Sequence, residues 1–255
     1  MRLLIMGALV YVIALVVQLP ASWAFHWARG TVPEAVTWQG VEGTIWHPRI
    51  NRLAVALPGG IQVPTGPVGV DFQPSALLTG ALGARFRAEL LGGTVRGRLT
   101  GGPGGRWTMS EIQGRLSLSR LADIDPRFGM AGAQGTLLFA GENLAGRALP
   151  EKGQLRATLE GLQVGLLPTD GPVGEYALRA EVTGPGRIRG EVQTLEERAL
   201  GIRGRFRADL RKRTYRFKGE GWVPSDAPQA VQDILPLLGP VRDGRVNIQR
   251  QGRLR

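Results

Sequence analysis

The feature that most constrains this chain is the regular alternation of apolar and charged residues along its length. In RFRAEL, residues 85–90, Phe86 and Leu90 fall on one side and the arginines fall on the other. A period of two is the repeat of an extended strand and not of a helix. TVRGRL alternates in the same way directly after a Gly-Gly turn, and RFRADL at 205–210 repeats the first strand. The pattern predicts hairpins with one apolar and one charged face.

The composition fits many such hairpins. The chain contains 38 Gly and 17 Pro, and 43% of its residues are hydrophobic, which indicates frequent turns in a folded protein and not disorder. Long helical patterns are missing; two short helices are expected, one from Ser119 to Pro126 and one within 225–239. We therefore predict a mainly β fold. It is an antiparallel curved sheet, or a sandwich or partial barrel of repeated hairpins, with one or two short helices.

A closed fold, such as a sandwich or barrel, and an open sheet differ in how much of the apolar face they bury. In a sandwich or barrel, Phe86, Leu90, Phe206 and Leu210 pack against apolar partners. In a lipid-carrying sheet, the same side chains line an accessible groove. Because the chain has only 6 Trp, 3 Tyr and 7 Phe, we expect a mostly packed apolar face.

The N-terminus predicts one transmembrane helix. The segment from Leu3 to Leu19 carries no charge and spans roughly 25 Å as a helix, and continuing it to Trp23 makes it long enough to cross a bilayer. Trp23 and Trp27 are four residues apart, share one helix face and suit the headgroup region. Arg2 on the near side favours a cytoplasmic N-terminus.

A cleaved signal peptide is the alternative, since small residues surround a cleavage position after Ala24. Both interpretations deliver the rest of the chain to the far side of the membrane. We predict an anchor at 1–28 and a periplasmic β-rich domain at 29–255, with a candidate internal boundary near 141–153.

Charge and chemistry narrow the function further. The net charge is +11 and nearly all of it is arginine, which fits either an anionic partner or a solvated surface. The chain has no Cys, and neither of its 2 His residues has metal-ligand spacing. We expect no catalytic residues, no cofactor, no metal site and no enzymatic activity. An exported location makes nucleic acid an improbable partner.

Two motifs follow the hydrophobic segment in a set order. V-E-G-T-I-W begins shortly after it, and P-x-x-L-L-x-G comes about thirty residues later, after a predicted strand pair. The motif residues are Val41, Gly43, Thr44, Ile45, Trp46, Pro74, Leu77, Leu78 and Gly80. This arrangement resembles the protein N family of the bacterial type II secretion system, closely over residues 1–90 and more loosely beyond.

The resemblance implies an accessory inner-membrane protein with one anchor and a periplasmic β domain. Its partners would be other secretion-system proteins, contacted during assembly or connection of the apparatus, together with the membrane. The chain is also similar to periplasmic sheet proteins of the AsmA-like group, which gives the alternative of a lipid-handling or envelope-maintenance protein with an apolar groove. In either case Gly43 allows close backbone approach, and Trp46 is expected to cover the sheet end nearest the membrane.

Overall fold

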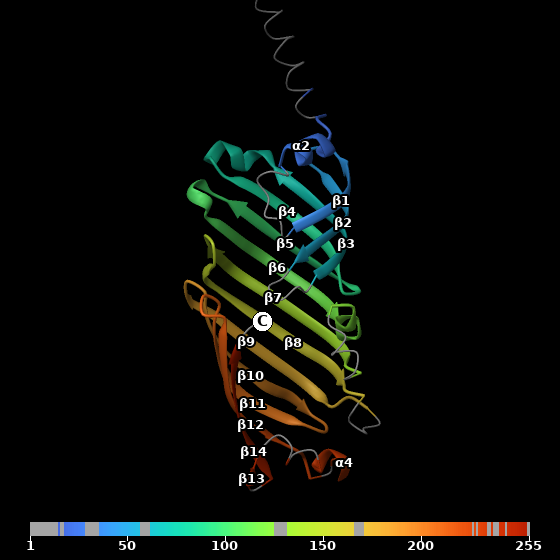
Figure 1. Cartoon of the computed structure of the whole chain (residues 1–255), viewed down its shortest axis with the longest axis vertical. Helices are drawn as coiled ribbons and strands as arrows, with labels where there is room; N and C mark the ends of the chain where they lie inside the picture. Colours follow the sequence, from blue (N-terminus) through green and yellow to red (C-terminus); the bar gives the residue numbers. More distant parts are fainter. Residues whose placement is uncertain are drawn as a thin grey trace, which may run out of the picture.

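The computed structural model describes residues 15, 18–28, 36–56, 62–124, 132–165, 171–225, 227, 229–233, 236, 240–242 and 244–253. They form one antiparallel sheet of fourteen strands (Figure 1). The strands are β1 (Val36–Gly43), β2 (Pro48–Ala56), β3 (Gln62–Gln73), β4 (Leu82–Leu90), β5 (Gly93–Gly101), β6 (Trp107–Ser117), β7 (Gln134–Gly146), β8 (Pro150–Gln163), β9 (Gly174–Gly184), β10 (Arg187–Glu197), β11 (Gly201–Asp209), β12 (Thr214–Trp222), β13 (Val241–Arg242) and β14 (Arg245–Arg253).

The strands stand in the sheet almost in the order of the chain. Only the last two depart from it, because β14 pairs with β12 and β13 occupies the edge. At about 4.8 Å per strand the sheet extends over roughly 60 Å along the long axis of the molecule. Within the described ranges, five short helices accompany it: α2 (Ala21–Ala28), η1 (Pro74–Thr79), η2 (Pro103–Gly105), η3 (Leu118–Asp123) and α4 (Gln229–Gln232). Helix α2 lies at the β1 end and α4 at the opposite end (Figure 1).

The predicted mainly β, antiparallel sheet with short helices is confirmed. The two quoted alternating stretches form the hairpins β4–β5 and β11–β12, and residues 141–153 lie within the hairpin β7–β8 of the same sheet. Most of the predicted anchor, including Leu3, lies outside the described residues. Among the residues that are described, no helix has the length and apolar character needed to cross a membrane.

One expectation about packing is wrong. The apolar face is expected to be mostly packed, but the described strands all belong to one open sheet, in which no second described sheet covers that face. The four apolar side chains named in the sequence analysis are only half-buried: Phe86, Leu90, Phe206 and Leu210. The physical reason is that alternation assigns side chains to a face without saying whether another sheet covers that face.

A row of apolar residues and glycines crosses thirteen of the strands without a polar interruption. Each member is the direct cross-strand partner of the next. The row consists of Val41, Ile50, Val68, Ala88, Val95, Gly114, Phe139, Ala157, Leu178, Val192, Gly204, Gly219 and Ile248. We call this the apolar row. It runs along the long axis, on the opposite face from most of the arginines.

Aromatic rings on this face lie over glycines of the neighbouring strand. Phe86 pairs with Gly97, Phe139 with Gly114 and Phe206 with Gly190. In each case a methyl group placed on the glycine would collide with the ring. The absent side chain therefore makes room for the ring to lie flat on the sheet, which covers apolar surface that a second layer would otherwise cover.

A small conventional core lies near the far end of the sheet. Val173, Ala199 and Val231 are buried together. Close by, Tyr176 is also buried, and its hydroxyl donates a hydrogen bond to the Leu200 carbonyl oxygen at 2.8 Å. Desolvation by this burial raises the pKa of Tyr176 to about 12. This cluster ties the ends of β9 and β11 to α4.

Replacing Gly190 with Ala tests the contact between rings and glycines. The new methyl group would collide with the Phe206 ring and with the Arg179 carbonyl oxygen. We expect Gly190→Ala to lower the free energy of unfolding by about 1–3 kcal/mol, the usual cost of overpacking. Gly69→Ala is the control, because its methyl group would meet nothing within 4 Å. Equal effects of the two substitutions on urea denaturation would contradict the proposed role of the glycines.

Candidate functional site

The first motif forms the tight connection between β1 and β2. Gly43 is the last residue of β1 and has a φ of +83°, a conformation that residues with a side chain rarely adopt. A Cβ atom at this position would also collide with the His47 carbonyl oxygen. Glycine is therefore required here for two separate reasons, and the four residues that follow it complete the turn into β2.

This connection holds the chain that arrives from the N-terminal segment. The Ile45 N–H donates a hydrogen bond to the Leu19 carbonyl oxygen at 2.9 Å, and Thr44 forms an isolated β-bridge with Pro20. On the other side, the carbonyl oxygen of the half-buried Trp46 accepts a hydrogen bond from the Phe72 N–H at 2.8 Å. The motif thus joins the end of the predicted anchor to strand β3.

The second motif begins two residues after Phe72 and forms η1. Pro74 is the first residue of this 3-10 helix, a position that suits its fixed φ and missing N–H. Gly80 directly follows the helix with a φ of +70°. Leu77 and Leu78 belong to η1, and their side chains lie outside the described part of the chain. The structure therefore brings the two motifs together through the Trp46–Phe72 hydrogen bond.

Helix α2 presents two indole rings to solvent beside this junction. Trp23 is 57% exposed and Trp27 is 72% exposed, and their ring centroids are 5.5 Å apart. The same helix is fixed to the sheet by Phe25, whose ring lies edge-on to Trp38 with a centroid distance of 5.7 Å. Large exposed rings next to a predicted anchor suit a membrane–water interface.

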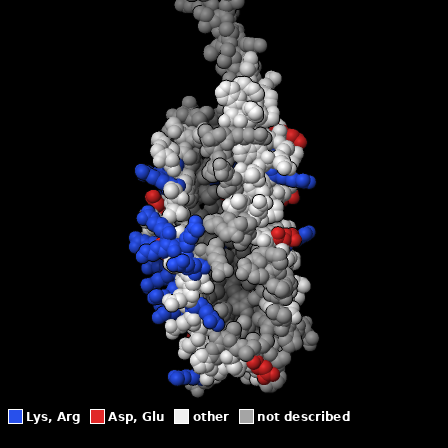
Figure 2. All heavy atoms as spheres, viewed as in Figure 1, with Lys and Arg blue, Asp and Glu red and all other residues white. Residues whose placement is uncertain are grey.

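The two faces of the sheet differ in chemistry. In Figure 2 the visible Lys and Arg side chains project outward and mostly from one flank of the molecule. The apolar row lies on the face that carries the aromatic rings, and ten of its thirteen members are only half-buried. An apolar face that no second described layer covers can receive an apolar ligand.

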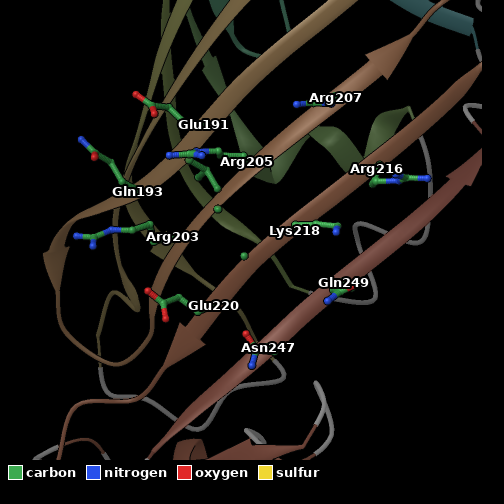
Figure 3. A pocket seen from close by; sticks show the side chains of 13 residues that line it. Glu191, Gln193, Arg203, Arg205, Arg207, Arg216, Lys218, Glu220, Asn247 and Gln249 are labelled. Carbon is green, nitrogen blue, oxygen red and sulfur yellow. The ribbon is translucent and has the colours of Figure 1, made fainter.

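The charged face carries a dense group of basic side chains on β11 and β12 (Figure 3). We call Arg203, Arg205, Arg207, Arg216 and Lys218 the cationic patch. They line a shallow depression of about 680 Å³, together with Glu191 and Glu220. All five basic side chains are exposed, and in the described part of the chain none of them makes a hydrogen bond or an ion pair.

The sheet register places like charges directly opposite one another on this face. Within the patch, Arg205 is the partner of Lys218 and Arg207 is the partner of Arg216. Further pairs of the same kind are Arg189 with Arg207, Arg156 with Arg179, Arg87 with Arg96 and Arg85 with Arg98. Like charges that face each other across strands destabilise a sheet. A bound anion would relieve this repulsion.

Sequence reasoning identified the arginines as outward-facing but missed the patch. Alternation places a residue on a face, whereas the patch depends on which residues become cross-strand partners. The described residues contain no group of three or more His, Asp or Glu side chains placed to hold a metal ion.

The comparisons with known proteins give one match. The family model described as Type II secretion system (T2SS), protein N matches residues 34–249, which covers most of the chain and nearly all of the sheet. No curated protein and no solved structure matches the chain.

Substitution of the motif glycine tests the junction. We expect Gly43→Ala to lower the free energy of unfolding by about 2 kcal/mol or more, because backbone strain adds to the collision with His47. Gly80→Ala is the matched control: its φ is also positive, but its methyl group would meet open space. Thermal melting of the full-length protein in detergent measures both. A loss for Gly43→Ala no larger than that for Gly80→Ala would contradict the close-contact role.

Proposed function

Because this chain belongs to the type II secretion system protein N family, we propose that it is an inner-membrane accessory of the secretion machinery, with its β sheet in the periplasm. Family membership itself makes the protein a component of that system. The finer proposal adds a single N-terminal anchor, a cytoplasmic N-terminus and contacts with other secretion proteins through the sheet.

The observation that carries the proposal is the junction between Leu19–Pro20 and Thr44–Ile45. Leu19 is the last residue of the uncharged segment, and its carbonyl oxygen is hydrogen-bonded to the first hairpin of the sheet. In the part of the chain that the structure describes, the end of the uncharged segment is therefore fixed to the sheet by backbone contacts. The exposed indoles of Trp23 and Trp27 beside this junction agree with a position at the bilayer surface.

The arrangement also favours a contact function over catalysis. The sheet is a single layer roughly 60 Å long, so each of its faces offers an extended surface. Its charged face carries unpaired arginines, and arginine is enriched in protein–protein interfaces. We propose no cofactor and no reaction for this protein.

Reporter fusions test the topology. An export-dependent phosphatase fused after Arg255 is expected to be active, because no second long apolar segment follows Leu19. A fluorescent protein that folds only in the cytoplasm is expected to be dark at the same position. The reverse result would overturn the proposed orientation.

A second candidate function, lipid handling, is favoured by one observation. The apolar row is continuous over thirteen strands and begins at the motif residue Val41, close to the predicted membrane side. An acyl chain laid along this row would cover side chains that are otherwise half-buried, and each buried CH₂ group would contribute about 0.8 kcal/mol. We propose this as the alternative to a purely protein-binding role.

Lipid extraction from the purified full-length protein tests this alternative. If acyl chains lie along the apolar row, lipid is expected to co-purify in stoichiometric amounts, and Phe86→Asp should abolish this co-purification by placing a charge on the apolar face. Arg87→Asp is the control, since the adjacent residue lies on the charged face. Lipid-free wild-type protein, or equal loss in both variants with folding intact, would reject the lipid role.

A further inference from the structure

We propose that the cationic patch binds an extended acidic segment of a partner protein. The inference rests on the proposed function, because it assumes that the sheet contacts other secretion proteins. It goes further by assigning the contact to Arg203, Arg205, Arg207, Arg216 and Lys218 and by naming the chemistry of the partner.

The first argument is electrostatic. Five exposed basic groups share one depression with only two carboxylates, Glu191 and Glu220, and none of the five forms an ion pair within the described part of the chain. Glu191 lies opposite Arg205 in the register without bonding it, and Glu220 bonds Arg245 outside the patch at 3.2 Å. The patch therefore carries an excess of positive charge. A partner carboxylate would both gain attraction and relieve the repulsion between Arg205 and Lys218.

The second argument concerns spacing. Arg203, Arg205 and Arg207 alternate along β11, so their side chains leave the sheet about 6.8 Å apart. An extended peptide with an acidic side chain at every second residue has the same repeat. Guanidinium groups also bind carboxylates in a bidentate fashion, so a peptide whose acidic side chains have the same spacing as the arginines would bind more tightly.

The third argument selects a peptide over a bilayer. The same depression contains the carboxylates of Glu191 and Glu220. A continuous phosphate surface would meet these two acidic groups wherever it met the arginines. A single extended peptide is about as wide as one strand, so it can follow the arginines of β11 and leave Glu191 on β10 and Glu220 on β12 uncovered.

The experiment uses the full-length protein in detergent and a fluorescent peptide of about twelve residues that alternates Glu with Thr. Binding is expected to be measurable at low salt and to weaken as the salt concentration rises to about 300 mM. A peptide of the same composition with all Glu residues in one block is expected to bind less tightly. Equal binding of the two peptides would overturn the match in spacing.

The double variant Arg205→Glu/Lys218→Glu is expected to weaken peptide binding by about tenfold or more. Arg87→Glu/Arg96→Glu is the matched control, because it reverses the same number of charges in a cross-strand pair of the same face, on β4 and β5. Equal losses in the two variants would mean that only the net charge of the protein matters. This result would overturn the assignment of binding to the cationic patch. Melting curves show whether each variant is folded, and Arg205→Gln/Lys218→Gln replaces the reversal if that variant is not.

Vesicles of phosphatidylglycerol in phosphatidylcholine provide the competing outcome. If they bind the patch more tightly than the alternating peptide does, the partner is a lipid surface and the proposal is wrong. The reporter fusions test the proposed function independently of the patch. A protein with a periplasmic C-terminus and no peptide binding would overturn only the present inference.

Discussion

The contact between an aromatic ring and a glycine on the next strand is the interaction on which this structure depends. A sheet normally buries its apolar face against another layer, and here the described residues supply none. The rings of Phe86, Phe139 and Phe206 instead lie over glycines of the neighbouring strand and cover the backbone there. Each such pair withdraws apolar area from water within a single layer. The sheet can then remain open over most of its length, with a conventional core only around Val173 among the described residues.

The two faces of the sheet follow from this solution. One face holds small residues and the aromatic rings that lie over glycines of the neighbouring strand. The other face spreads its side chains outward and consists largely of arginine. Because the register sets arginines opposite one another, the charged face contains unfavourable pairs of like charges. The apolar face, in contrast, is continuous. A secretion-system component with these two surfaces can present a charged face to a protein and an apolar face to a lipid.

Much of this architecture can be predicted from the period of two. Alternation in RFRAEL and RFRADL correctly marks the strands, the turns and the charged side of each hairpin. It does not reveal the number of layers, because a half-buried Phe206 and a buried one have the same sequence pattern. It does not reveal cross-strand partners either, since register shifts such as those between Arg96 and Arg98 are set by local backbone geometry. The cationic patch and the apolar row both depend on these partners.

The order of the strands also governs how the molecule can form. From β1 to β12 every strand pairs with the strand that precedes it in the chain, so the contacts are local and the relative contact order is low. Such a sheet can nucleate at its first hairpin and then lengthen by one strand at a time, as repeat proteins do. A β domain whose first strands reach the far side of a membrane before the later ones would need no later segment before it began to fold. Among the described strands, β13 and β14 depart from this order, because β13 pairs only with β14, which is made after it and which pairs directly with β12.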